Sequence, residues 1–169
     1  MRPLTAEETD NLEASSSDTI IGDSLNRLDD STDYEQSLQK LKSLHHSQCL
    51  FNRNPPVPDL RFRFNDEGVL HGDFTCAGYH QGYDNMVHGG VIAAIIDASM
   101  TQCLMGHGIV GYTTDLSIKY RKPVFIRRKA NLETSVKEVK MGLLYSMRCE
   151  IVQDHNLVVQ ATGRFFKVK

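Results

Sequence analysis

The chain has 169 residues, of which 40% are hydrophobic and 24% charged, and its formal net charge is −2. These values are typical of an ordinary globular protein with a single domain. No apolar run approaches 18 residues, so we expect no membrane span. We find no interleaving of aromatic and basic residues that would favour nucleic acid, and we expect none as a partner.

The charge is unevenly distributed along the chain. Residues 1–35 hold ten acidic and two basic residues, whereas the rest carries a net charge of +6. Residues 1–32 are rich in Ser, Thr, Asp and Glu, which favours an acidic leader that adds little to the core. We expect residues 33–169 to form the folded domain. Its mildly basic charge suits a phosphate-bearing ligand, although solvated surface explains most Lys and Arg side chains.

The start of the chain and the cysteines indicate a compartment. Residues 1–10 lack a basic region followed by an apolar core, so we expect neither a secretory signal nor a transit peptide. The four cysteines are widely spaced and form no C-x-x-C pair, which argues against a zinc cluster or a redox pair. We therefore expect a cytoplasmic protein whose thiols stay reduced. The cysteines are Cys49, Cys76, Cys103 and Cys149.

Hydrophobic periodicity predicts an α+β arrangement. A helix is expected from residue 32 or 33 to 46, with Leu38, Leu41 and Leu44 at spacings of three. Prolines then break the chain over 52–58. The remaining predictions are a hairpin of strands 60–65 and 69–76, a glycine-rich loop over 78–90, an apolar helix over 88–105, and strands over 110–120, 130–140, 143–153 and 157–168. The last three strands should form an antiparallel meander, and the sheet should wrap around the single apolar helix.

Asp97 stands out because it follows six apolar residues, 91–96, inside the predicted central helix. Aspartate is a poor residue for a helix interior, since its short side chain competes for backbone hydrogen bonds. An ionised carboxylate is also costly to bury without partners. Asp97 therefore either has a structural partner or takes part in a catalysed reaction.

The glycines at the start of that helix suggest a site for a carbonyl oxygen. Gly89 and Gly90 let backbone approach a ligand closely, and the first N–H groups of a helix have no internal partners. Such donors can stabilise an oxyanion. A plain glycine turn before a helix is the commoner use. His88 could orient the loop, polarise a carbonyl or hydrogen-bond to backbone.

The spacing of these groups predicts a dimer. Asp97 lies eight residues after Gly89, which is about 12 Å along one helix. A general base and an oxyanion donor must both lie about 3 Å from the reacting centre. If both groups act, a second copy of the chain must supply one of them across a two-fold axis.

The segment Asn85-Met86-Val87-His88-Gly89-Gly90 followed by Asp97 resembles the H-G-G-x6-D signature of hotdog-fold acyl-CoA thioesterases. Gln81-Gly82-Tyr83, Tyr120-Arg121-Lys122-Pro123 and Cys49-Leu50-Phe51 also match. The resemblance covers about residues 48–168 and is closest to the phenylacetate-pathway and 4-hydroxybenzoyl-CoA thioesterase-like branch. It implies a hotdog fold, in which a curved antiparallel sheet surrounds one central helix. It also implies an acyl-CoA substrate, no cofactor, and a homodimer or a dimer of dimers.

The resemblance also implies roles for individual residues. Asp97 would act as general base or as nucleophile on the thioester. Gly89 would donate its N–H from the other subunit, with support from His88, and the Thr113 hydroxyl would orient the water or the carboxylate, although Thr113 could equally be an ordinary strand residue. Residues expected to contact substrate or CoA are Gly90, Asn85, Gln81, Arg121 and Lys122, with Arg127, Arg128 and Lys129 further out and the acyl chain near Ile95, Met100, Leu104 and Tyr79.

One departure from the family pattern leaves alternatives open. Several members carry Asn or Gln six residues before the histidine, where this chain has Gly82. Gln81 or Asn85 could substitute for that amide. A hotdog protein that binds acyl-CoA without hydrolysing it is therefore an alternative. A hydro-lyase acting on acyl thioesters is a third reading, but the motifs usual for that branch are missing.

Overall fold

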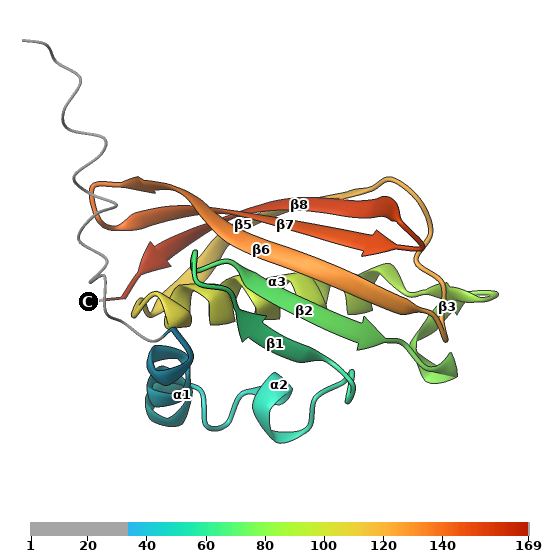
Figure 1. The fold of residues 1–169 in the computed structure, drawn as a ribbon, viewed down its shortest axis with the longest axis horizontal. Coiled ribbons are helices and arrows are strands. Elements are labelled where there is room, and N and C mark those ends of the chain that lie inside the picture. The colour runs from blue at the N-terminus through green and yellow to red at the C-terminus, as the bar shows by residue number, and fades with distance from the viewer. Residues whose placement is uncertain (1–33, 169) are drawn as a thin grey trace, which may run out of the picture.

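The computed structural model describes residues 34–168, so the predicted leader lies outside the described residues. The elements follow one another along the chain as Figure 1 shows. Their bounds are α1 Tyr34–His45, α2 Leu50–Arg53, β1 Arg61–Phe64, β2 Leu70–Thr75, η1 Gly78–His80, β3 Gln81–Tyr83, β4 Met86–Val87, α3 Gly89–Gly106, β5 Gly111–Tyr120, β6 Lys129–Lys140, β7 Leu144–Gln153 and β8 Asn156–Lys167.

Six strands form one sheet in the order β1-β2-β6-β7-β8-β5. Every neighbouring pair in this sheet is antiparallel. The sheet curves along one side of α3, and α1 packs against α3 from the other side (Figure 1). The predicted α+β hotdog architecture is therefore confirmed.

The meander of β6, β7 and β8 is joined by two tight turns. Met141 and Gly142 have φ of 55° and 65°, and Asp154 and His155 have φ of 51° and 62°. Positive φ at both central residues is typical of the type I′ turn, whose twist matches that of paired strands. The second turn is shorter than predicted, because Asn156 already pairs with Gln153 as the first residue of β8.

The helix α3 supplies the centre of the core. Its Ile92, Ile95, Ile96, Met100 and Leu104 are 0–1% exposed and pack against buried side chains of the sheet. Each such side chain contributes about 1.5–3 kcal/mol through burial. By length and composition α3 is also apolar enough to cross a membrane, but 61% of it is buried inside the domain, as expected of a core helix.

Two segments differ from the prediction. The short helix α2 was not predicted, and the region 78–90 is not a simple loop, because it contains η1 and the β3–β4 pair. The predicted helix that carries Leu38, Leu41 and Leu44 is present as α1, in which Leu38 is 2% exposed and Leu44 is 63% exposed.

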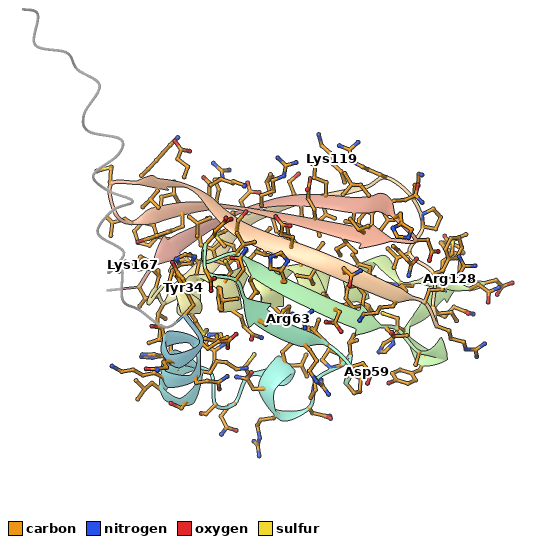
Figure 2. The ribbon with its side chains drawn as sticks, in the orientation of Figure 1. Tyr34, Asp59, Arg63, Lys119, Arg128 and Lys167 are labelled. Atoms are coloured by element: carbon orange, nitrogen blue, oxygen red, sulfur yellow. The ribbon has the colours of Figure 1, made fainter. Side chains whose placement is uncertain are left out.

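His107, at the C-terminal end of α3, is enclosed by rings from two other elements. Its ring centroid lies 4.9 Å from that of Tyr34 at the start of α1 (Figure 2) and 6.3 Å from that of Phe64 in β1. Its Nε2 lies 2.9 Å from the Gly68 carbonyl oxygen. Burial lowers the pKa of His107 below its ordinary value of 6.5, although the hydrogen bond to Gly68 acts in the opposite direction.

We expect the free energy of unfolding to fall as pH drops below about 6.5, and to fall less in His107→Gln. The unfolded chain takes up a proton at the ordinary pKa, whereas the folded protein resists it, so acid favours unfolding. Urea titrations between about pH 7.5 and about pH 5 measure this dependence. His45→Gln, at an exposed position, is the control. Identical pH dependence in wild type and His107→Gln would contradict the expectation.

Candidate functional site

The glycine loop ends at His88, which caps the N-terminus of α3. His88 has extended backbone, with φ of −60° and ψ of 131°, and its Nδ1 accepts a hydrogen bond from the Gly90 N–H at 2.9 Å. The N–H of Gly89, the first residue of the helix, has no acceptor among residues 34–168. The loop therefore presents one free backbone donor at the positive end of the helix dipole.

Tyr120 holds this loop from the end of β5. Its hydroxyl donates a hydrogen bond to the Gly89 carbonyl oxygen at 2.8 Å. Partial burial raises the pKa of Tyr120, so the hydroxyl keeps its proton and stays a donor. No role of its own was predicted for Tyr120. Its place in the Tyr120-Arg121-Lys122-Pro123 motif was the available signal.

Asp97 and Thr113 meet across the interface between α3 and β5. The Thr113 Oγ1 donates a hydrogen bond to the Asp97 Oδ1 at 2.6 Å, and both residues are half-buried. The register of β5 against β8 shifts between Thr113 and Asp115, so Thr114 is the extra residue of a β-bulge. Because of this bulge, Thr113 before it and Leu116 after it both turn inward.

One continuous helix carries both the free donor and the carboxylate. Since α3 runs unbroken from Gly89 to Gly106, Asp97 lies about 12 Å along the axis from Gly89. The two groups of one chain are therefore too far apart to act on the same carbonyl.

The residues before His88 shape the loop. The Gln81 Oε1 accepts a hydrogen bond from the Asn85 N–H at 3.1 Å, and Asn85 has φ of 62°. A Cβ added at Gly82 would lie 3.0 Å from the His88 Cα and 3.3 Å from its side chain. A side chain at residue 82 would therefore fit only if His88 shifted by a few tenths of an ångström.

The predicted basic residues gather near the same end of α3. Arg121 and Lys122 are exposed and directly follow Tyr120. Their side chains donate hydrogen bonds to Gln160 and Asn156. Further along, Arg128 pairs with Asp154 at 2.8 Å and projects from the end of the molecule (Figure 2). Arg127 and Lys129 are also exposed.

A cavity of about 90 Å³ lies beside Asp97, between α3 and the α1–α2 segment. From α3 it is lined by Ala98, Thr101 and Met105. The residues expected near the acyl chain do not line this cavity: Ile95, Met100 and Leu104 are 0–1% exposed in the core against the sheet, and Tyr79 is 73% exposed. Nearly all of α3 is apolar, so its sequence does not distinguish the two faces.

Two buried thiols, those of Cys76 and Cys103, are poorly suited to nucleophilic chemistry. Burial raises the pKa of Cys103 to about 12 and that of Cys76 to about 11, so both thiols stay protonated at neutral pH. Within the described part of the chain, no group of three or more His, Cys, Asp or Glu side chains could hold a metal ion.

Comparison with known proteins identifies the class. Residues 84–159 match the sequence model of the thioesterase superfamily. The chain is similar in fold to the PaaI protein of the phenylacetic acid degradation operon of E. coli, with a TM-score of 0.67, 14% identity, and coverage of 81% of this chain and 96% of PaaI. The chain therefore has the hotdog fold of that structure, and over residues 84–159 its sequence is similar to the thioesterase superfamily.

More specific similarities come from two further proteins. Rat acyl-coenzyme A thioesterase THEM4 is 33% identical over 93 residues, which cover 54% of this chain and 40% of the relative. The chain thus matches about two fifths of the length of this curated relative. A hypothetical thioesterase from Streptococcus pneumoniae, solved with coenzyme A, has a TM-score of 0.61 and 17% identity, and the match covers 66% of this chain and 90% of that protein.

Proposed function

We propose that this domain hydrolyses an acyl-CoA to a free acid and CoA. The observation that carries the proposal is the 2.6 Å contact between Thr113 and Asp97, which holds a half-buried carboxylate in the wall of a cavity. The free Gly89 N–H would supply the matching oxyanion donor. The match of residues 84–159 to the thioesterase superfamily supports the same chemistry.

Asp97 would work by one of two routes. As general base it takes a proton from water while the water oxygen attacks the thioester carbon, and the C–S bond then breaks to release CoA. As nucleophile it attacks that carbon directly, the C–S bond breaks to release CoA, and water then hydrolyses the resulting mixed anhydride to the free acid and regenerates the Asp97 carboxylate. In either route the carbonyl oxygen becomes negative and accepts a hydrogen bond from Gly89. His88 positions this donor by holding the neighbouring Gly90 N–H.

The spacing along α3 requires two subunits for one site. The strand β5 is the long edge of the sheet, and it carries Thr113 next to Asp97. The other edge, β1, has four residues and exposes Arg61 and Arg63, which suits an edge that stays unpaired. A second copy that pairs along β5 would bring its own Gly89 toward Asp97. Light scattering should therefore show a dimer or a dimer of dimers, and a monomer at micromolar concentration would contradict the composite site.

The CoA portion would lie near the start of α3. Arg121 and Lys122 follow Tyr120, whose hydroxyl binds Gly89, so both cations are close to the oxyanion donor. Arg127, Arg128 and Lys129 extend the same basic surface. Their charges suit the phosphates of CoA, since cations steer and hold anionic ligands. Gly90, Gln81 and Asn85 would border the thioester as parts of the glycine loop.

Two related structures support the pairing of Asp97 with Thr113. The pneumococcal thioesterase was also solved as an aspartate-to-alanine and as a threonine-to-alanine variant. The two substituted positions are sixteen residues apart, as are Asp97 and Thr113. The alternative is an acyl-CoA-binding protein without turnover, which the missing amide at Gly82 favours.

The deciding experiment is the release of free thiol from a panel of acyl-CoAs. Turnover by the wild type with steady-state kinetics would establish the thioesterase. Binding of acyl-CoA without any thiol release would establish the alternative. The panel should include aryl, short, medium and long acyl groups.

Removing the Thr113 hydroxyl should lower kcat by about tenfold to a hundredfold in Thr113→Val. A hydrogen bond to a charged group contributes about 1.5–3 kcal/mol, and the isosteric valine leaves Asp97 without it. Steady-state thiol release measures the effect. Thr113→Ser keeps the hydroxyl and is the matched control. Equal rates in Thr113→Val and wild type would show that Thr113 is only a strand residue.

A further inference from the structure

The geometry points to a short acyl group ending in a carboxylate as the preferred substrate, with Lys42 binding that carboxylate in the cavity beside Asp97. This inference rests on the proposed thioesterase function and names its substrate class. Lys42 acts here as a specificity-determining residue that contacts the acyl end and takes no part in the chemical step.

The cavity sets the length of the acyl group. Its volume is about 90 Å³, and one water occupies about 30 Å³ in the liquid. The cavity therefore has room for about three water-sized groups. This space suits the end of a short acyl group and is too small for a long fatty chain.

The walls of the cavity differ in polarity along its length. Ala98, Met105 and Phe51 supply apolar surface for methylene groups. Lys42 and Gln102 supply polar atoms, and the Lys42 Nζ donates a hydrogen bond to the Gln102 Oε1 at 3.4 Å. Gln102 lies five residues after Asp97 on α3, which places it about 7.5 Å further along the axis. The ammonium group of Lys42 is therefore separated along α3 from the carboxylate of Asp97, which would act on the thioester.

Lys42 forms no ion pair with a carboxylate of residues 34–168. Among the described residues no carboxylate lies within 4.0 Å of its Nζ, and Gln102 is its one hydrogen-bond acceptor. Burial lowers the pKa of Lys42, while the nearby Cys49 and Glu35 act to raise it. A half-buried ammonium group with one long hydrogen bond keeps two donors for a ligand. A substrate carboxylate would supply the missing counter-charge and form charge-assisted hydrogen bonds.

This wall of the cavity belongs to a part of the chain that the superfamily model does not match. The match covers residues 84–159, whereas Lys42 lies on α1 and Phe51 on α2. The α3 wall of the cavity, which carries Asp97, therefore lies within the region that matches the superfamily. The α1–α2 segment supplies the features that select the acyl group in this chain.

The test compares two substrates with the same number of non-hydrogen atoms. Glutaryl-CoA ends in a carboxylate, and 5-methylhexanoyl-CoA ends in an isosteric isopropyl group. We expect wild-type kcat/KM to be about tenfold to a hundredfold higher for glutaryl-CoA, as one charge-assisted contact provides. The difference should lie mainly in KM, because Lys42 contacts the part of the substrate that does not react.

Lys42→Met keeps the length of the side chain and removes its charge. We expect it to abolish the preference for glutaryl-CoA over 5-methylhexanoyl-CoA. Lys40→Met, at an exposed position on the same helix, is the matched control and should keep the preference. Lys42→Arg should restore part of it. A preference that survives in Lys42→Met, or no preference in wild type, would overturn the inference.

Binding separates this inference from the proposed function. Calorimetric titration of the Asp97→Asn variant should show tighter binding of glutaryl-CoA than of 5-methylhexanoyl-CoA, and addition of Lys42→Met should remove the difference. If no thioester is hydrolysed but this difference is present, the thioesterase proposal fails and the acyl-group preference stands. If thioesters are hydrolysed but the two ligands bind equally, the preference fails alone.

Discussion

Asp97→Asn is expected to lower kcat for thioester hydrolysis by about 10²–10⁴-fold. Asparagine has the shape of aspartate and still accepts the hydrogen bond from Thr113 through its amide oxygen. It cannot take a proton from water, and it is a poor nucleophile toward a thioester. Free-thiol release measures the loss, and acyl-CoA binding should be retained.

The control for this variant is Asp84→Asn, which changes an exposed carboxylate in the β3–β4 turn. Its rate should equal that of the wild type. Urea unfolding should show that Asp97→Asn stays folded, because the half-buried contact with Thr113 is preserved. An unchanged rate in Asp97→Asn would refute both catalytic routes for this carboxylate.

Gly89→Pro should lower kcat by about 10²–10³-fold, the usual cost of losing one oxyanion donor. Proline lacks the N–H group, and the Gly89 N–H is the donor proposed to bind the oxyanion. The substitution is mild for the fold, because proline is favoured at the first position of a helix. The residue before it, His88, already has the extended backbone that precedes proline, with ψ of 131°.

Gly89→Ala distinguishes the loss of the N–H donor from the steric effect of a side chain at this position. A Cβ at this position would lie 3.5 Å from the Tyr120 ring, an ordinary van der Waals distance. The alanine variant keeps the N–H group and should retain most of the activity. Equal losses in both variants would show that the glycine itself, and not its N–H, is required.

The two variants also test whether one site draws on two subunits. Asp97→Asn and Gly89→Pro chains are each expected to be nearly inactive alone. In a mixed dimer, one site combines the intact Asp97 of one chain with the intact Gly89 of the other. Co-expression with two different affinity tags should therefore restore activity. If mixed dimers remain inactive, each site lies within one subunit.

The sequence predicted the fold because local signals agreed with the global arrangement. Turn residues such as Gly142 mark tight hairpins, and the run 91–96 is too apolar to lie anywhere except the core. Asp97 could be singled out because a carboxylate contradicts its surroundings in that run. Its distance from Gly89 followed directly from helix geometry, and the continuous α3 confirms that separation.

The parts of the candidate site that the sequence did not predict depend on contacts between residues that are far apart in the chain. Lys42 meets Gln102 across 60 residues, and Tyr120 meets Gly89 across 31. Nothing local in Lys42 distinguishes it from Lys40, since both are lysines of one amphipathic helix. The faces of α3 were likewise indistinguishable, so the cavity wall at Ala98, Thr101 and Met105 became visible only once α1 and α2 were placed.

The long edge strand β5 also affects the tendency of the protein to aggregate in solution. An exposed strand edge is a template onto which other polypeptides add, and this is a common start of aggregation. Pairing of two copies along β5 would close that edge as well as complete the site. Substitutions that weaken the pairing should therefore lower the yield of recoverable protein as well as its turnover, and dilution should reduce the specific activity of what remains.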